Sequence, residues 1–401
     1  GKFSFLNTPV LKNQRSCYLT FTSEEVHDIL KTGFEKSPLF TGRIKGTGPR
    51  YCPSIEDKIE RFADKERHQL FIEPEGWETA EYYVNGFSSS LPEEVQFAAL
   101  RKVKGFEHAR FFRPGYAIEY DYFPPNQLSF SLESKVIEHL YLAGQINGTT
   151  GYEEAAAQGF MAGINAHLKL QGREPFILKR SEAYIGVLID DLITKGTEEP
   201  YRMFTSRAEY RILLRQDNAD QRLTRKAHEL GLASDNRLKA LNEKYASIEI
   251  LIDFLKKTSI APEEANSMLD RCGTAQLSQG TKLVTLLLRP QISIKDMIRD
   301  LPPVNEFVEK CTGCVTEVIE EAEIQIKYEG YIKKEQEIAD KLSRLEHMPL
   351  DPGVDYHQLK SLSSEAREKL SHVRPETIGQ AARISGVSPA DISVLIVHLG
   401  R

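Results

Sequence analysis

The stretch Gly144-Gln-Ile-Asn-Gly-Thr-Thr-Gly-Tyr-Glu-Glu-Ala-Ala-Ala-Gln-Gly159 holds a glycine-rich turn that runs directly into a predicted helix over 152–168. A β-like run over 136–143 precedes the turn. Small residues on the early face of the helix let it lie close to a sheet or to a bound planar ring. Amide groups in such a turn are free to point at a ligand above the sheet edge. The pattern therefore indicates a β–turn–α unit.

The side chains of the turn leave two interpretations open. Gln145, Asn147, Thr149 and Thr150 are a denser group of hydrogen-bonding side chains than a connector needs, which favours contact with a cofactor or a phosphate. A plain β–turn–α connection remains the alternative. The sequence contains neither a Gly-x-Gly-x-x-Gly dinucleotide fingerprint nor a Walker A motif. If a dinucleotide binds here, its main phosphate loop is missing from this chain.

Composition limits the class of protein. The 401 residues carry 52 Lys and Arg against 58 Asp and Glu, so a uniformly basic nucleic-acid coat is excluded and any RNA contact must be local. Charged residues at 27% and hydrophobic residues at 40% are typical of a globular protein. Five cysteines do not make a disulfide framework and favour a reducing compartment. We expect no membrane span, because the longest aliphatic run is far too short.

The pattern of residues divides the chain near position 180. Before it, we predict helices over 23–31 and about 90–103, both with capping-box spacing, and strands over 69–72, 82–84 and 116–122. From 185 onward the sequence reads as helix after helix. The amphipathic segments there are 225–257 and about 314–347, and two short helices over 375–384 and 389–399 end the chain.

A second candidate site lies in Gly46-Thr-Gly-Pro-Arg-Tyr-Cys-Pro-Ser-Ile-Glu-Asp-Lys58. Arg50 can hold a phosphate or carboxylate through two parallel hydrogen bonds. Cys52 has Arg50 and Lys58 near it in sequence, and positive neighbours raise the thiolate fraction of a cysteine. A buried, inert cysteine is the alternative. A lone pair, Cys311 and Cys314, lacks the further ligands of a zinc site, so coincidence is favoured there.

A third candidate is the segment from Glu199 to Arg215. Arg207, Arg211 and Arg215 are four residues apart, so on a helix they would form one basic stripe with Tyr210 beside it. The stretch 202–226 holds seven Lys or Arg and three Asp or Glu, which is a positive region in an acidic protein. Binding to a phosphate backbone and a salt-bridged helix packed on another domain are both open.

At Gly144–Gly159, continuing to Ala166, the chain resembles the signature of the glucose-inhibited division protein A family, also called MnmG. Other blocks that resemble the family, in family order, are Gly48–Asp57, Arg113–Asp121, Glu199–Arg211, Lys327–Ile332 and Ile378–Gly386. The resemblance implies an α/β FAD/NAD(P)-binding, Rossmann-like portion with an inserted α/β region, followed by an all-α C-terminal domain. Family members begin with a Rossmann-type FAD domain that has the glycine fingerprint. This chain looks like roughly the C-terminal two-thirds of such a protein.

The resemblance also implies a division of the chain into three regions. Residues 1–110 would be the inserted NAD-binding region, 111–180 the C-terminal part of the FAD-binding domain, and 181–401 a helical domain that binds tRNA and a GTPase partner. Gln145 matches a family FAD contact, and Asn147, Gly148 and Thr149 are its neighbours. Cys52 matches a functionally important family cysteine, which could act as a nucleophile. The helical region would hold tRNA through Arg202, Arg207, Arg211 and Arg215.

The family's NAD-binding stretch falls on one continuous block of this sequence. The residues concerned are Gly48, Pro49, Arg50, Tyr51, Cys52, Pro53, Ser54, Ile55, Glu56, Asp57, Lys58, Ile59, Glu60, Arg61 and Phe62.

The implied activity is addition of a carboxymethylaminomethyl group to C5 of the wobble uridine of certain tRNAs. FAD, NADH and methylene-tetrahydrofolate as one-carbon donor would take part, and glycine or ammonia would complete the group. The implied partners are tRNA, a second copy of the chain in a homodimer, and the GTPase MnmE in a heterotetrameric complex. The expected compartment is the bacterial cytoplasm, with mitochondria as the alternative. Two other classes stay open: a module that binds tRNA and the GTPase without catalysis, and a flavin reductase acting on small molecules.

Overall fold

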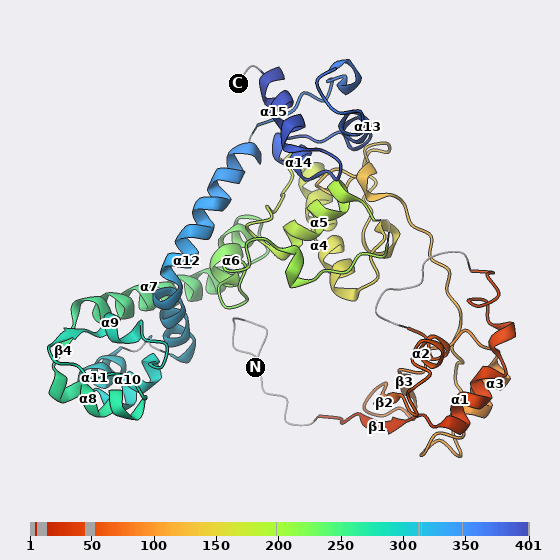
Figure 1. Ribbon diagram of the computed structural model, residues 1–401, viewed down its shortest axis with the longest axis horizontal. Helices are drawn as coiled ribbons and strands as arrows, with labels where there is room; N and C mark the ends of the chain where they lie inside the picture. The colour runs from red at the N-terminus through yellow and green to blue at the C-terminus, as the bar shows by residue number, and fades with distance from the viewer. Residues whose placement is uncertain are drawn as a thin grey trace. The chain divides into compact units, whose positions relative to one another are not determined.

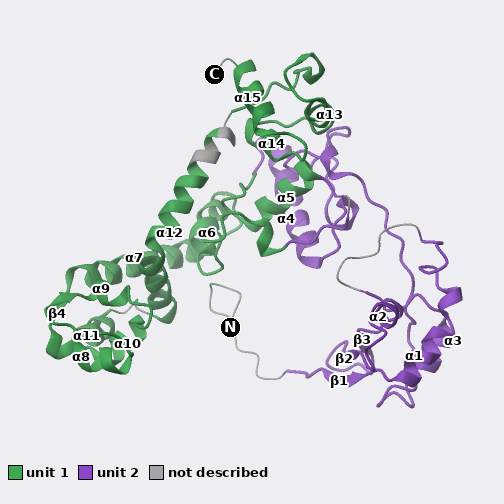
Figure 2. Ribbon diagram, viewed as in Figure 1, with its two compact units in different colours: residues 1–7, 177–195, 204–401 green, residues 8–176, 196–203 purple. Residues whose placement is uncertain are grey.

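The computed structural model describes residue 5 and residues 14–44, 53–197, 199–311, 313, 315–346 and 348–399, with the side chains of 341–343 and 345–346 left aside. Two compact units divide the chain (Figure 2). Unit 2 comprises Thr8–Phe176 and Gly196–Met203, and unit 1 comprises Gly1–Asn7, Ile177–Lys195 and Phe204–Arg401. Among the described residues, no helix is both long enough and apolar enough to cross a membrane.

Unit 2 begins with a small antiparallel sheet in the order β1-β2-β3. Its strands are β1 Tyr18–Phe21, β2 Gln69–Pro74 and β3 Tyr82–Asn85. The helices α1 Glu24–Lys31, α2 Ile55–Arg61 and α3 Glu93–Leu100, together with the short 3-10 turn η1 Phe34–Lys36, accompany it. Leu70 and Ile72 are buried while Phe71 between them is exposed, as the period of two in a strand requires. These elements share one apolar core. The predicted strands over 69–72 and 82–84 and the predicted helices over 23–31 and about 90–103 are confirmed.

The helix starts follow local chemistry that differs from the predicted capping boxes. Ser23 is the N-cap of α1, and its hydroxyl accepts from the amide of Val26 at 3.5 Å. Helix α3 has no side-chain cap, because its N-cap is Pro92, and the hydroxyl of Ser90 donates to the carboxylate of Glu56 at 2.6 Å. The capping box predicted at Ser90 is therefore wrong, although the helix itself is present.

The second part of unit 2 contains η2 Pro125–Gln127, η3 Gly144–Asn147 and the long helix α4 Tyr152–Leu170. The strands predicted over 116–122 and 136–143 are wrong: the backbone there is irregular, with an isolated bridge between Glu133 and Tyr141. Gln96 holds Gly115 by two hydrogen bonds of 2.8 and 2.9 Å, which fixes the chain just before 116–122 without a partner strand. The sheets of the described residues are antiparallel, so the Rossmann-like portion stays a prediction.

Unit 1 is helical apart from a short ladder of β4 Ser259–Ile260 and β5 Thr281–Lys282, which confirms the predicted helical second half (Figure 1). Its helices are α5 Tyr184–Lys195, α6 Ala219–Glu229, α7 Asp235–Lys257, α8 Pro262–Arg271, α9 Leu283–Leu287, α10 Ile294–Asp300, α11 Pro302–Lys310 and α12 Thr316–Glu346. Helices α7 and α12 pack together, and an apolar core joins α7–α12. The predicted segment 225–257 is two helices, separated at Gly231 with φ +77°.

A separate apolar core forms the end of the chain. It contains η5 Tyr356–Gln358, α13 Ser364–Val373, α14 Ile378–Arg383 and α15 Pro389–His398. Thr377 and Ser388 begin the last two helices as capping boxes, in which each hydroxyl accepts from the third helical amide. The two predicted terminal helices are therefore confirmed.

Candidate functional site

The glycine-rich turn is held by a single buried side chain of α4, Gln158. Its Oε1 accepts from the amide of Gly144 at 3.1 Å and from Nδ2 of Asn147 at 2.8 Å. Its Nε2 donates to Oγ1 of Thr149 at 3.0 Å. Because Gln158 is fully buried, these bonds lock the turn onto the helix that follows it. Sequence reasoning missed Gln158; the available signal was one amide side chain among the small residues of the helix face.

The predicted cofactor-binding residues of the turn fall into two groups. Gln145 is exposed on η3, where its side chain is accessible to a ligand. Asn147 and Thr149 are buried and their side chains bond inward to Gln158. They therefore shape the turn, and a ligand would meet its backbone and Gln145 first.

Gly148 makes the turn possible. Its φ of +77° lies in the left-handed region, and an added Cβ would come 2.5 Å from Oγ1 of Thr197. That oxygen, Oγ1 of Thr150 and Oδ1 of Asn147 are buried and have no hydrogen-bond partner in the described part of the chain. Such oxygen atoms are costly unless a polar group meets them, so the turn fits a polar ligand such as a flavin ribityl chain or ring edge.

The N-terminus of α4 is occupied by carboxylates of the chain. Glu154 is 2% exposed, and its Oε1 accepts from the amide of Met203 at 2.7 Å and pairs with Nε of Arg202 at 3.3 Å. Glu153 lies in the same first turn and pairs with Arg202 at 3.8 Å. Two carboxylates, with Arg202 as their partner, therefore occupy the helix N-terminus that would otherwise favour a phosphate.

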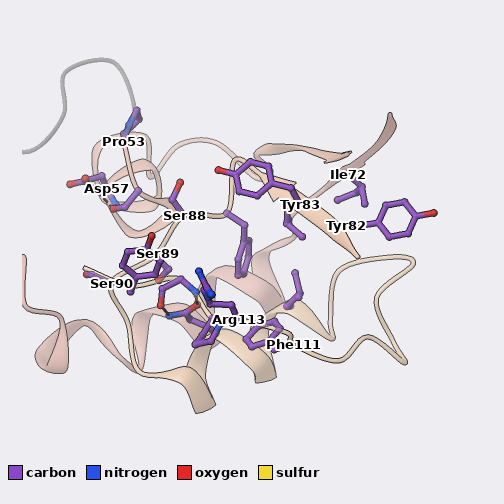
Figure 3. A pocket seen from close by; sticks show the side chains of 18 of the residues that line it. Pro53, Asp57, Ile72, Tyr82, Tyr83, Ser88, Ser89, Ser90, Phe111 and Arg113 are labelled. Atoms are coloured by element: carbon purple, nitrogen blue, oxygen red, sulfur yellow. Dashed lines mark hydrogen bonds between the residues drawn. The ribbon is translucent and has the colours of Figure 1, made fainter. Parts of the chain in front are cut away.

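A pocket lies in the α/β part of unit 2, with an open volume of about 2480 Å³. Figure 3 shows Asp57, Ser89 and Arg113 among the side chains around it. The wall of Ser88–Ser90 is fixed to α2, because the amide of Ile55 donates to the carbonyl of Ser88 at 2.7 Å and Glu56 accepts from the amide of Ser90 at 2.7 Å. Glu56 is fully buried, and its second oxygen has no partner among the described residues.

The predicted NAD-binding block is split by this arrangement. Pro53, Ser54, Asp57, Arg61 and Phe62 line the pocket. Ile55 and Ile59 point into the apolar core, and Nζ of Lys58 donates to the carbonyl of Gly86 at 3.0 Å. Of the other two described residues, Glu56 is buried and Glu60 is exposed. Gly48, Pro49, Arg50, Tyr51 and Cys52, and also Cys314, lie outside the described residues.

The arginine segment is not a helix, so the prediction of one basic stripe is wrong. Only Thr205–Arg207 forms a 3-10 turn, called η4, and the chain continues as turns. Tyr210 is buried rather than exposed beside the arginines. The side chains of Ala208 and Tyr210 are both buried. Residues two positions apart lie on different faces of a helix, so this pattern is not helical.

The described arginines have different surroundings. Arg202 pairs with Glu154 in unit 2, as given above. Arg207 lies 4.0 Å from Asp191, and Arg215 lies 3.0 Å from Asp217 and 3.3 Å from Glu321 within unit 1. Arg211 is exposed. Salt-bridged packing therefore accounts for part of the positive charge of this segment, and RNA contact by these residues stays a prediction.

A buried ion network that the sequence did not indicate lies behind the arginine segment. Arg180, 8% exposed, pairs with Asp191 at 2.8 Å and with Glu209 at 2.7 Å. Burial opposes the charge of Asp191, yet Lys195 and Arg180 hold the pKa of that carboxyl below its usual value. Among the described residues, no group of three or more His, Cys, Asp or Glu could hold a metal ion.

Comparison with known proteins agrees with the sequence blocks. Residues 1–174 match the family model for glucose inhibited division protein A. Residues 235–336 and 338–401 match the C-terminal helical domain and helical bundle of the tRNA modifying enzyme MnmG/GidA.

Two bacterial relatives match the whole chain. Proteins of Christiangramia forsetii and Flavobacterium psychrophilum, each named tRNA uridine 5-carboxymethylaminomethyl modification enzyme MnmG, are 62% and 63% identical over 402 residues. The match covers 100% of this chain and 64% of each relative. The crystal structure of Aquifex aeolicus GidA in crystal form I has a TM-score of 0.79 and 46% identity, covering 98% of this chain and 61% of that chain. The chain belongs to the glucose-inhibited division protein A (MnmG) family.

Proposed function

We propose that this chain forms part of an FAD- and NADH-dependent enzyme that adds a carboxymethylaminomethyl group to C5 of the wobble uridine of certain tRNAs. The observation that carries the proposal is the identity of 62–63% along the whole chain to two proteins named for this modification. The chain spans 64% of the length of these two proteins, so the proposal concerns the activity of a protein as long as they are.

The turn of Gly144–Gly151 is proposed to contact FAD. The exposed Gln145 and the backbone at Gly148 would hold the cofactor, while Asn147, Thr149 and Gln158 keep the turn in shape. Among the described residues, buried oxygens of Thr150 and Thr197 have no hydrogen-bond partner, which supports a polar ligand here. When bound, the flavin supplies the redox chemistry, and the protein supplies orientation and electrostatics.

The block Gly48–Phe62 and its pocket are proposed to bind NADH, the reductant. Ser54, Asp57 and the fixed Ser88–Ser90 wall offer hydroxyl and carboxylate groups suited to ribose hydroxyls. Cys52 is proposed as a nucleophile whose thiolate adds to the uridine ring or to a one-carbon adduct supplied by methylene-tetrahydrofolate. A Cys52→Ser variant that binds FAD and still modifies tRNA would remove this role.

The helical unit is proposed to bind the macromolecular partners. Arg202, Arg207, Arg211 and Arg215 would contact tRNA, and the terminal helices α14 and α15 would dock the GTPase MnmE in a heterotetrameric complex with a homodimer of the enzyme. The separate apolar core of residues 348–399 supports a docking module, since it gives this end its own stability. The relatives are bacterial, which supports a cytoplasmic location.

A chimera tests the proposal. The 401 residues replace the matching residues of the Christiangramia forsetii relative, and the purified chimera is given NADH, methylene-tetrahydrofolate, glycine, the GTPase and unmodified tRNA. We expect a flavin spectrum that bleaches with NADH and a modified uridine in the digested tRNA, detected by mass spectrometry. A folded, flavin-loaded chimera that leaves the uridine unchanged would refute the proposed activity. If NADH bleaches the flavin of the chimera and the 401-residue chain on its own binds no tRNA, a flavin reductase acting on small molecules is the better account.

A further inference from the structure

Two exposed tyrosines occupy the middle of helix α12. Tyr328 is 47% exposed and Tyr331 is 65% exposed, and their ring centroids lie 6.2 Å apart at an interplanar angle of 52°. Gly330 lies between them, and a Cβ added there would meet nothing within 4 Å. Large aromatic side chains are costly to leave in water, and the surface around this pair is open. The pair is therefore a candidate contact surface.

The tyrosines lie beside the arginine segment of the same unit. The amide of Leu213 donates to Oε2 of Glu335 at 2.8 Å, and Arg215 pairs with Glu321 at 3.3 Å. Tyr328 is seven residues, about two helical turns, from each of these anchor points on α12. Because residues two turns apart share a face, Tyr328 lies on the side of α12 that faces this segment, and Tyr331 borders it.

Two basic side chains near the pair are left exposed. In the stretch Lys327–Lys334, Lys327 pairs with Glu323 at 2.8 Å, which leaves Lys333, Lys334 and one glutamate. That glutamate, Glu329, pairs with Lys256 of α7 at 3.3 Å, so its charge is compensated within the unit. Lys333 and Lys334 are exposed on α12, and Arg211 is exposed in the adjacent segment. This combination is complementary to a polyanion that carries planar groups.

We infer that Tyr328 and Tyr331 form a stacking surface for unpaired bases of tRNA, flanked by phosphate contacts from Arg211, Lys333 and Lys334. Single-stranded RNA is recognised in this way, with splayed bases on aromatic rings and basic side chains along the backbone. A protein partner would need a wider apolar patch with fewer charges at its centre. The inference rests on the proposed function, because it takes tRNA as the substrate.

The test is binding of fluorescently labelled tRNA to the full 401-residue chain at several salt concentrations. A stacked base contributes roughly 1–3 kcal/mol, so Tyr328→Ala with Tyr331→Ala should weaken binding by about tenfold or more. The salt dependence should stay unchanged, since no phosphate contact is lost. Arg211→Ala should weaken binding and lower the slope of log K against log salt by about 0.7.

Three comparisons isolate stacking from folding. Tyr328→Phe with Tyr331→Phe keeps the rings and should bind tRNA as the unaltered chain does. Ile338→Ala removes another exposed apolar side chain, 44% exposed, from the same helix and should have no effect. Circular dichroism checks that all variants keep their helix content.

Each outcome has one meaning. Equal tRNA binding by the Tyr→Ala chain and the unaltered chain would overturn the stacking surface and leave the proposed function intact. If the Tyr→Ala change instead alters only the oligomeric mass in light scattering, the surface binds protein and the inference is wrong. Absence of tRNA binding by the unaltered chain would overturn the inference, and modification of tRNA by the chimera would then decide the proposed function separately.

Discussion

Asp190 of α5 and Arg383 of α14 form an ion pair across 193 positions of sequence, with Nε of Arg383 2.7 Å from Oδ1 of Asp190. Asp190 is 5% exposed and also lies 3.3 Å from Arg180. One carboxylate therefore ties the terminal helices to the network behind the arginine segment. In the proposed function, the terminal helices dock the GTPase and the arginine segment binds tRNA.

Removal of Arg383 should loosen the terminal helices. Arg383→Ala leaves the carboxylate of Asp190 with Arg180 and the donating hydroxyl of Thr194 as partners, so we expect a loss of about 1–3 kcal/mol rather than the full cost of an unpaired buried charge. Hydrogen exchange of the α14 amides should accelerate. Lys295→Ala breaks an exposed pair with Glu320 and should leave the exchange of the α14 amides unchanged. Equal exchange in both variants would show that the Asp190 pair does not hold α14.

Two glycines of one region should respond to alanine in opposite ways. Gly148→Ala places a Cβ 2.5 Å from Oγ1 of Thr197 at a φ of +77°, so we expect a loss of about 1–3 kcal/mol and weaker flavin binding by the chimera. Gly159→Ala, inside α4 with open space, should raise stability by up to about 1 kcal/mol. Thermal unfolding measures both. A neutral Gly148→Ala would contradict the described turn.

The stability of the α/β part should fall on acidification because of a histidine pair. His27 and His68 have ring centroids 5.2 Å apart. Burial, the neighbouring His68 and Lys31 lower the pKa of His27, while burial and Lys58 lower the pKa of His68. Both are neutral in the folded state, so stability present above pH 6.5 is lost as the pH falls through 6.5 toward the lowered values.

The measurement for the histidine pair is the unfolding midpoint at pH 7.5 and pH 5.0. His68→Gln should reduce the difference between the two midpoints, because one proton-binding group is gone and His27 loses a positive neighbour at low pH. An unchanged difference would show that acid acts through other groups.

Glu321 should titrate near neutral pH. Its burial and the adjacent carboxylate of Asp217 raise its pKa to about 7, while Gln325 and Arg215 bond to it. A raised pKa gives stability that is complete below pH 4.5 and is lost as the pH rises through about 7. Glu321→Gln keeps a neutral amide there, so it should stabilise the chain more at pH 8 than at pH 5. Denaturant unfolding at both pH values checks this, and equal effects would contradict it.

Local patterns predicted much of the fold. β-like runs beside the turn signal Asn85-Gly86 identified Gln69–Ile72 and Tyr82–Val84, amphipathic patterns identified α7 and α12, and the two short terminal helices were also predicted. The same reasoning failed at 116–122, because alternation describes a strand only when a neighbouring strand supplies hydrogen bonds. It failed again at Arg207–Arg215, where Arg180 and Glu321, far apart in sequence, bind the segment and override its helical spacing.

The candidate site shows the same limit. The turn of Gly144–Gly151 was predictable because its glycines and polar residues are local. Gln158, which holds it, and the pairing of Arg383 with Asp190 depend on tertiary contacts that spacing does not reveal. The tyrosines of α12 could be found only once their exposure was known, since Tyr at helical spacing is usually core.

The most direct measurement of the central claim is the nucleoside composition of tRNA from bacterial cells whose only copy of the enzyme is the chimera. We predict that mass spectrometry detects 5-carboxymethylaminomethyluridine or its further-modified forms, and that the Gly159→Ala chimera gives the same amount. Wobble uridine that remains unmodified, in cells that accumulate the folded flavin-bound chimera and the GTPase, would contradict the account.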